Sequence, residues 1–118
     1  MKRRFRLTRS TDFQRVRRIG KAYSHPLVVL IAAQNQLEQT RIGIVAGRAV
    51  GSAVHRNRAK RRLRASLEAH IARLPAGWDL IFLARKPIDQ AGFLEICTAV
   101  QTILTRAGFK NERPEPRR

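Results

Sequence analysis

The residues best suited to chemistry in this sequence form a dense run of cations, "HRNRAKRRLR", at positions 55–64. Arginine outnumbers lysine in the run, and a guanidinium group can hold a phosphate through two parallel hydrogen bonds. No acidic residue occurs between Arg41 and Glu68, whereas an ordinary solvated helix face mixes both signs of charge. The run therefore favours a surface that binds a polyanion over a helix face that is merely solvated.

The whole chain carries the same excess of positive charge. It has 118 residues, a formal net charge of +17 and a pI of about 11.9, and 43% of its residues are hydrophobic. That length and composition allow one domain with one modest core. Charge of one sign repels itself, so a polyanionic partner is the natural explanation. Nucleic acid is the leading candidate, and an anionic membrane surface is the weaker one.

Cysteine content and hydropathy predict a cytoplasmic protein. Cys97 is the only cysteine, so no disulfide can form within the chain. The longest apolar run, residues 26–33, is far too short to span a bilayer, and the basic N-terminus is not followed directly by a signal-type apolar segment. We therefore expect no membrane partner.

The sequence offers no candidate active site of its own. Its eight acidic residues are scattered, and no pair has the helix-face spacing of a two-metal site. His25, His55 and His70 are far apart, with no cysteine or carboxylate at ligand spacing. We expect no catalytic residue and no tightly bound metal in the protein.

Two aromatic residues allow both structural and functional interpretations. Trp78 opens an apolar segment and is predicted to be a core or loop anchor in preference to a base-stacking platform. Phe13 fits the core of a short N-terminal helix, but it could instead lie exposed in a groove and stack on a nucleotide. The residue pattern by itself favours the core for Phe13.

Hydrophobic periodicity and turn residues predict the elements that must position these groups. They are, in chain order, a helix over residues 11–20, strands over 27–33 and 41–47, a loop or short strand at 47–52, a helix over 53–74, a strand over 78–85 and a helix over 93–107. This order, α-β-β-β-α-β-α, predicts an α+β fold: a single-domain α/β sandwich over residues 1–109 with the helices on one face of a small sheet. The other face is left open for a ligand, and the basic tail at 110–118 is expected to be disordered.

The cation run falls within the predicted helix over residues 53–74. Thr11 is predicted to start a capping box in the first helix, and Ser52 to cap this one. An apolar stripe faces the core, with most cations pointing away from it; it consists of Ala59, Leu63, Leu67, Ile71 and Leu74. The second helix of a helix-turn-helix is missing, so RNA is favoured over duplex DNA as the partner.

The segment "RIGIVAGRAVGSAVHRNRAKRRLR" resembles the protein subunit of bacterial ribonuclease P. The matching residues are Arg41-Ile42-Gly43, Arg48, Gly51, Ala53-Val54, Arg56-Asn57-Arg58, Lys60-Arg61 and Arg64. An N-terminal pattern also matches, through Leu7, Asp12, Phe13, Val16 and Gly20. "LPAGWDLIFLARKP" is similar to the family's closing strand, so the resemblance covers all but the tail.

The resemblance implies a fold and a division of labour. It implies a βαβ crossover of the unusual left hand. The catalyst would be a partner RNA with Mg²⁺ held mainly by that RNA, and the protein alone would be inactive. The protein would bind this RNA and the 5′ leader of precursor tRNA, assist endonucleolytic removal of the leader and broaden substrate specificity. The alternatives are a structural RNA-binding protein without a processing role and a DNA-binding protein.

The resemblance also assigns residues to these roles. RNA-subunit binding is implied for Arg48, Arg56, Asn57, Arg58, Lys60, Arg61 and Arg64. Leader binding is implied for Phe13, Arg17 and Ile31, in a cleft between the first helix and the sheet. Arg17 and Ile31 stand where the family can have aromatic residues, and Gly47-Arg48-Ala49 replaces the frequent Ser-Lys-Lys. Leader binding is therefore expected to depend more on charge and less on stacking.

Overall fold

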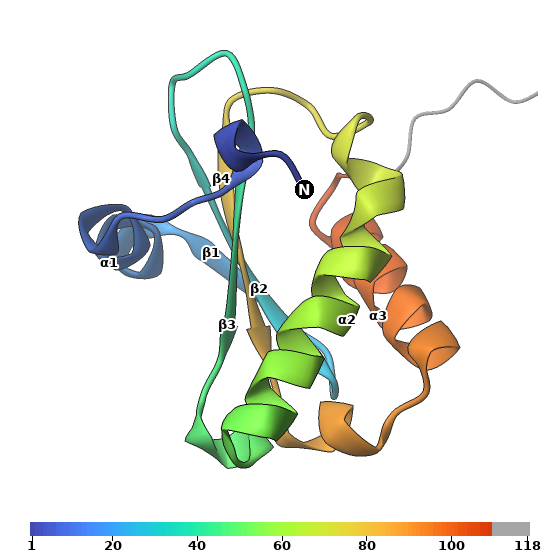
Figure 1. Ribbon diagram of the computed structural model, residues 1–118. Coiled ribbons are helices and arrows are strands. Elements are labelled where there is room, and N and C mark those ends of the chain that lie inside the picture. The colour runs from blue at the N-terminus through green and yellow to red at the C-terminus, as the bar shows by residue number, and fades with distance from the viewer. Residues whose placement is uncertain (110–118) are drawn as a thin grey trace, which may run out of the picture.

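A computed structural model describes residues 1–109 of the chain (Figure 1). Its helices and strands are α1 (Ser10–Ile19), β1 (Lys21–Ser24), β2 (Val28–Gln34), β3 (Arg41–Ala46), α2 (Ala53–Ile71), β4 (Trp78–Ala84) and α3 (Phe93–Arg106), with short 3-10 helices η1 (Arg3–Phe5), η2 (Arg48–Val50) and η3 (Lys86–Gln90). The expectation of a disordered tail concerns 110–118, which lies outside the described residues. None of the helices in residues 1–109 is long and apolar enough to cross a membrane.

The four strands form one sheet in the order β1-β2-β4-β3. Only the β3–β4 pair is parallel, and α2 supplies the crossover between these two strands. The α+β sandwich and the order α-β-β-β-α-β-α are thereby confirmed, while the left hand of the crossover stays a prediction.

Three strands precede α2, as predicted, but one of them is formed by a different segment from the one predicted. The segment at 47–52 contains the 3-10 helix η2 and no strand. The additional strand is β1, which forms an antiparallel hairpin with β2 and was not predicted. Its four residues, "KAYS", are mostly exposed at the sheet edge, so they lack the apolar alternation that marks a half-buried strand.

The helices lie on both faces of the sheet, and the prediction of a single covered face was wrong for α1. Helices α2 and α3 cover one face and α1 crosses the other (Figure 1). The physical reason is that the central strands β2 and β4 are apolar on both faces, so each face needs cover. Val16 of α1 is fully buried against this second face.

The main core lies between the sheet and helices α2 and α3. Ala59, Leu63 and Leu67 are almost completely buried there, as predicted, while Ile71 and Leu74 are partly buried at its edge. The two predicted side-chain caps were wrong. Ser52 precedes α2 but its side chain makes no cap hydrogen bond, and α1 begins one residue before Thr11, with Arg9 at the cap position.

On the second face, α1 packs closely because one strand residue has no side chain. Gly43 of β3 lies beneath the Phe13 ring, and a Cβ built at Gly43 would be 2.6 Å from Cζ of Phe13. That separation is well inside van der Waals contact. The position of the Phe13 ring on the sheet therefore requires glycine at position 43.

We predict that Gly43→Ala lowers the free energy of unfolding by about 1–3 kcal/mol, because the added methyl group overpacks the contact with Phe13. Denaturant unfolding measures this change. Gly47→Ala is the matched control, since a Cβ at Gly47 meets no atom within 4 Å. Equal stability of the two variants would contradict the close packing of Phe13 on Gly43.

Candidate nucleic-acid interface

The outward face of α2 carries the exposed part of the cation run. Asn57, Arg58 and Arg61 are exposed, and Lys60 and Arg64 are half-buried along one flank of the helix. The positions between them, Ala59 and Leu63, are buried in the core, so the backbone beneath the cations is fixed. Arg48 is exposed in η2, just before α2. The structure thus places most of the predicted RNA-binding residues on one side of the molecule.

Two arginines of the run hold the protein's own backbone. The Arg56 guanidinium donates to the Gly51 carbonyl at 2.9 Å, and that of Arg62 donates to the Ala91 carbonyl. Both are half-buried. Arg62 therefore ties α2 to the segment before α3, and Arg56, which was assigned to RNA binding, also closes the turn that leads into α2.

The start of α2 has a further brace that sequence reasoning missed. His55 Nδ1 lies 2.9 Å from a carboxylate oxygen of Asp89 in η3. Gly51 has a φ of 139°, a conformation that favours glycine, and His55 Cβ would be 3.0 Å from a Cβ at Gly51. The glycine thus allows the sharp entry into α2 that brings His55 to Asp89. The two residues are far apart in sequence, which hid their pairing.

The three predicted leader-binding residues lie beside one another on the second face of the sheet. Phe13 and Ile31 are half-buried and pack against the same small core, and Arg17 is exposed one helical turn after Phe13. Phe13 packs on Gly43 and against the small core, as the structural interpretation predicts, and its stacking on a nucleotide stays a prediction. In the neighbouring row of the sheet, Val29 of β2, Leu83 of β4 and Val45 of β3 lie next to one another.

This row is a half-buried apolar strip that α1 does not fully cover. A smaller cavity of about 170 Å³ runs from Phe13 past Arg6 to Arg64 of α2. Phe13 and the basic helix α2 therefore border the same cavity. Sequence reasoning missed Arg6 as part of this surface, although the basic N-terminal block was visible.

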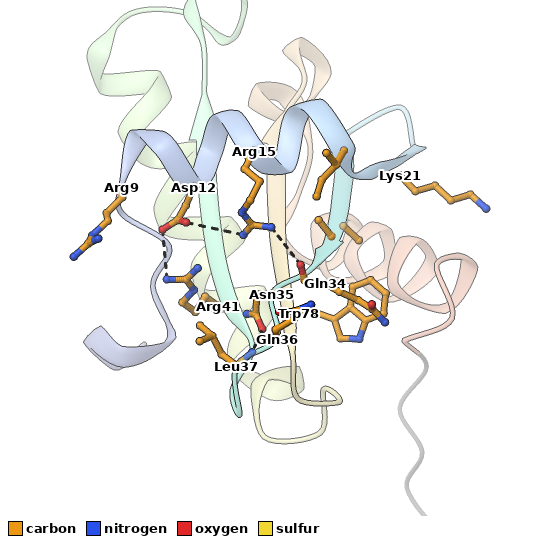
Figure 2. Close-up of a pocket in the computed structure, with 13 residues that line it drawn as sticks. Arg9, Asp12, Arg15, Lys21, Gln34, Asn35, Gln36, Leu37, Arg41 and Trp78 are labelled. Carbon is orange, nitrogen blue, oxygen red and sulfur yellow. Dashed lines mark hydrogen bonds and ion pairs between the residues drawn. The ribbon is translucent and has the colours of Figure 1, made fainter.

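A buried carboxylate holds α1 in place over the sheet. Asp79 of β4 is fully buried and accepts two hydrogen bonds from Arg41, at 2.9 and 2.8 Å, and one from Asn35 at 2.8 Å. The Arg15 guanidinium of α1 donates to the same carboxylate. It also donates, at 3.2 Å, to the Gln34 carbonyl (Figure 2). Asp79 therefore links α1 to β2, β3 and β4.

The hydrogen bonds and charges around Asp79 lower its pKa by more than burial raises it. Burial by itself raises the pKa of Asp79, but hydrogen bonds from Arg41 and Asn35 and the charges of Arg41 and Arg15 lower it below the ordinary value of 3.8. Asp79 hence stays ionised in the folded protein. Sequence reasoning counted it only among scattered acids, although a lone aspartate in the apolar segment "WDLIFLA" was a signal for a buried ion pair.

The part of the chain that the structure describes contains no cluster of metal-ligating side chains. Across residues 1–109, no three His, Cys, Asp or Glu side chains form a group that could hold a metal ion.

Comparisons with known proteins identify the family. The model of the family described as Ribonuclease P matches residues 1–108. The chain belongs to the ribonuclease P protein family. The ribonuclease P protein component of Herpetosiphon aurantiacus is 38% identical over 116 residues, covering 98% of this chain and 94% of that protein. That of Dehalococcoides mccartyi is 40% identical over 115 residues, with the same coverage of 98% and 94%.

Solved ribonuclease P proteins share the fold. The Staphylococcus aureus protein gives a TM-score of 0.83 at 28% identity and covers 91% of this chain and 98% of its own. The Thermotoga maritima protein gives 0.77 at 27% identity, with 86% and 96% covered. A Staphylococcus aureus mutant described as having defective mRNA degradation activity gives 0.83 at 26% identity, with 89% of each chain covered.

We predict that Asp79→Asn destabilises this ribonuclease P protein by about 3 kcal/mol at neutral pH, because Arg15 and Arg41 lose the charge that compensates them. The depressed pKa of Asp79 means that its contribution is present in full above the ordinary value of 3.8 and is lost as the pH falls through the lower value of the folded state. Denaturant unfolding at several acidic pH values measures both effects.

The variant should therefore show a flatter loss of stability with acid than the parent chain. Asp12→Asn is the control, because Asp12 is partly exposed and its contacts with Arg41 and Arg15 are longer, at 3.4 and 4.0 Å. An Asp79→Asn protein as stable as Asp12→Asn would show that the buried network does not hold the fold.

Proposed function

We propose that this chain is the protein component of a ribonuclease P ribonucleoprotein, binding the catalytic RNA subunit and the 5′ leader of precursor tRNA. The observation that carries this proposal is the outward face of α2, where Asn57, Arg58 and Arg61 are exposed above a buried apolar stripe. Family membership supports it. In this role the protein assists endonucleolytic removal of the leader and broadens the range of precursors cleaved.

The α2 face suits the phosphates of a folded RNA. Its cations stand on a helix that the core, the Arg62–Ala91 hydrogen bond and the His55–Asp89 contact hold at several points. A helix whose backbone is already fixed loses little conformational entropy when it binds, so affinity gains from this rigidity. Contacts to phosphates also release counterions, which makes the binding salt-dependent. Arg48, Lys60 and Arg64 extend the same surface on either side.

The cleft beside α1 suits a single RNA strand. Phe13 and Ile31 offer apolar surface on which a base can rest, and Arg17 is exposed one helical turn after Phe13. The apolar row formed by Val29, Leu83 and Val45 continues this floor. Only one aromatic ring is available among these residues, so leader binding relies on charge and aliphatic contact as much as on stacking.

Bond cleavage is the part of the reaction that the RNA subunit carries out in this proposal. Mg²⁺ ions held mainly by that RNA supply the activated water. The protein's residues bind and orient the two RNAs and by themselves cleave no precursor tRNA. We place this activity in the cytoplasm, in keeping with a chain that can form no internal disulfide.

Reconstitution tests the proposal. The protein is mixed with the cognate RNA subunit and precursor tRNA at low Mg²⁺, where the protein's help in binding the substrate matters most. We expect faster cleavage and tighter substrate binding, with a smaller gain for a precursor whose leader is only one nucleotide long. No gain with either substrate would reject the function.

In the second part of that assay, RNA-free protein is incubated with precursor tRNA or with an unstructured mRNA. We expect no cleavage of the precursor, and cleavage at the holoenzyme rate would overturn the assignment of catalysis to RNA. Co-purification separates the alternatives. A structural RNA-binding protein would bring down ribosomal RNA, and a DNA-binding protein would bind duplex DNA comparably at physiological salt.

We predict that Arg58→Ala and Arg61→Ala each weaken binding of the RNA subunit. Each removes one exposed cation, and one lost phosphate contact lowers the slope of log affinity against log salt by about 0.9. Filter binding over a range of salt concentrations measures the slope. Arg73→Ala, an exposed arginine just beyond α2, is the matched control. Slopes equal to that of the control would show that Arg58 and Arg61 contact only solvent.

A further inference from the structure

Helix α1 crosses the second face of the sheet and has two flanks above it. Phe13 and Arg17 lie four residues apart on one flank of α1, while Arg15 and Ile19 lie four apart on the opposite flank. The second flank borders a groove of about 800 Å³ (Figure 2). Neither Phe13 nor Arg17 lines this groove, so it is distinct from the proposed leader cleft.

The floor and one wall of the groove are built rigidly. The Asp79 network holds Arg15 and Arg41 at its base. The wall is the turn after β2, in which the Asn35 amide donates to the Gln39 carbonyl at 3.1 Å and its oxygen accepts from the Leu37 amide at 2.8 Å. Such an Asx turn fixes the backbone without help from a ligand. The groove is therefore formed before anything binds.

The charges of the groove suit an anionic chain. Four cations and one carboxylate line it. Arg15 and Arg41 engage both this carboxylate, that of Asp12, and the buried carboxylate of Asp79 beneath the groove. The remaining cations are Arg9 and Lys21, which are exposed and have no carboxylate partner among residues 1–109. The Lys21 ammonium lies 5.6 Å from the centre of the Tyr23 ring, so Lys21 keeps its positive charge available to an anion.

These two cations stand at opposite ends of α1, a ten-residue helix and hence about 15 Å long. That separation fits an extended polyanion along the groove better than a single small anion.

An aromatic residue lies in the same groove. Trp78 is half-buried, packs edge-on against Phe109 with ring centroids 4.9 Å apart, and contributes to the groove lining. Its packing makes Trp78 an anchor, as the sequence predicted, yet part of the indole stays accessible from the groove. A site that binds single-stranded nucleic acid typically combines aromatic surface with cations, and this groove contains both.

We propose that this groove is a second binding site for single-stranded RNA, with backbone phosphates at Arg9 and Lys21 and a base against Trp78. The site rests on the proposed function only in taking RNA as the chain's partner. Its α1 residues lie on the opposite flank of the helix from Phe13 and Arg17, so a strand in the groove leaves those two residues available. One protein could then hold two single-stranded segments at once.

Tryptophan fluorescence provides a direct test, because Trp78 is the only tryptophan in the chain. A short oligouridylate is titrated into the protein and into Phe13→Ala, which removes the aromatic of the other cleft. We expect saturable quenching in both proteins. In Arg9→Gln/Lys21→Gln the quenching should need at least tenfold more oligonucleotide, and the salt slope should fall by about 1.4 for the two lost contacts to a single strand.

Arg73→Gln/Lys86→Gln is the matched control, since it makes the same change of charge at exposed sites outside the groove. Equal affinities of the two double variants, absence of quenching, or equal quenching by inorganic polyphosphate would each overturn the second site. Circular dichroism verifies that all variants are folded. The reconstitution assay is independent of this readout, so a failed groove and a failed ribonuclease P function are distinguishable.

Discussion

The buried carboxylate of Asp79 is the interaction on which the arrangement of the second sheet face depends. It accepts hydrogen bonds from β3, from the turn after β2 and from α1, through Arg41, Asn35 and Arg15. A buried charge is costly unless it is paired and fully hydrogen-bonded. The network meets that requirement only when α1 lies across the sheet, which in turn creates the groove along the flank of the helix that carries Arg15 and Ile19.

Positive charge in this protein serves both structure and binding. Arg56, Arg62 and Arg106 donate to backbone carbonyls, and Arg15 and Arg41 compensate a buried carboxylate. Arg56 closes a local turn, and the other four join segments that are far apart in the chain. The cations that remain exposed repel one another and have few acids to pair with, so the fold itself leaves repulsion in place that the proposed RNA partner would relieve.

The sequence predicted the long, strongly periodic elements well. The stripe through Ala59, Leu63 and Leu67 located α2, and continuous apolar runs located β2 and β4, because burial imposes a visible pattern. The edge strand β1 was not predicted, because an exposed strand carries no such pattern. The caps at Thr11 and Ser52 also failed, because a suitable side chain near a helix start does not by itself make the hydrogen bond.

The sequence by itself determined a single basic domain, its element order and a helix with one apolar and one cationic face. These follow from composition and local periodicity. Only the tertiary structure decided that α1 lies on the opposite face from α2, that Asp79 meets Arg15, and that Trp78 shares a groove with Lys21. Those contacts join residues distant in the chain, and no local pattern specifies them, because they arise from packing both faces of one sheet.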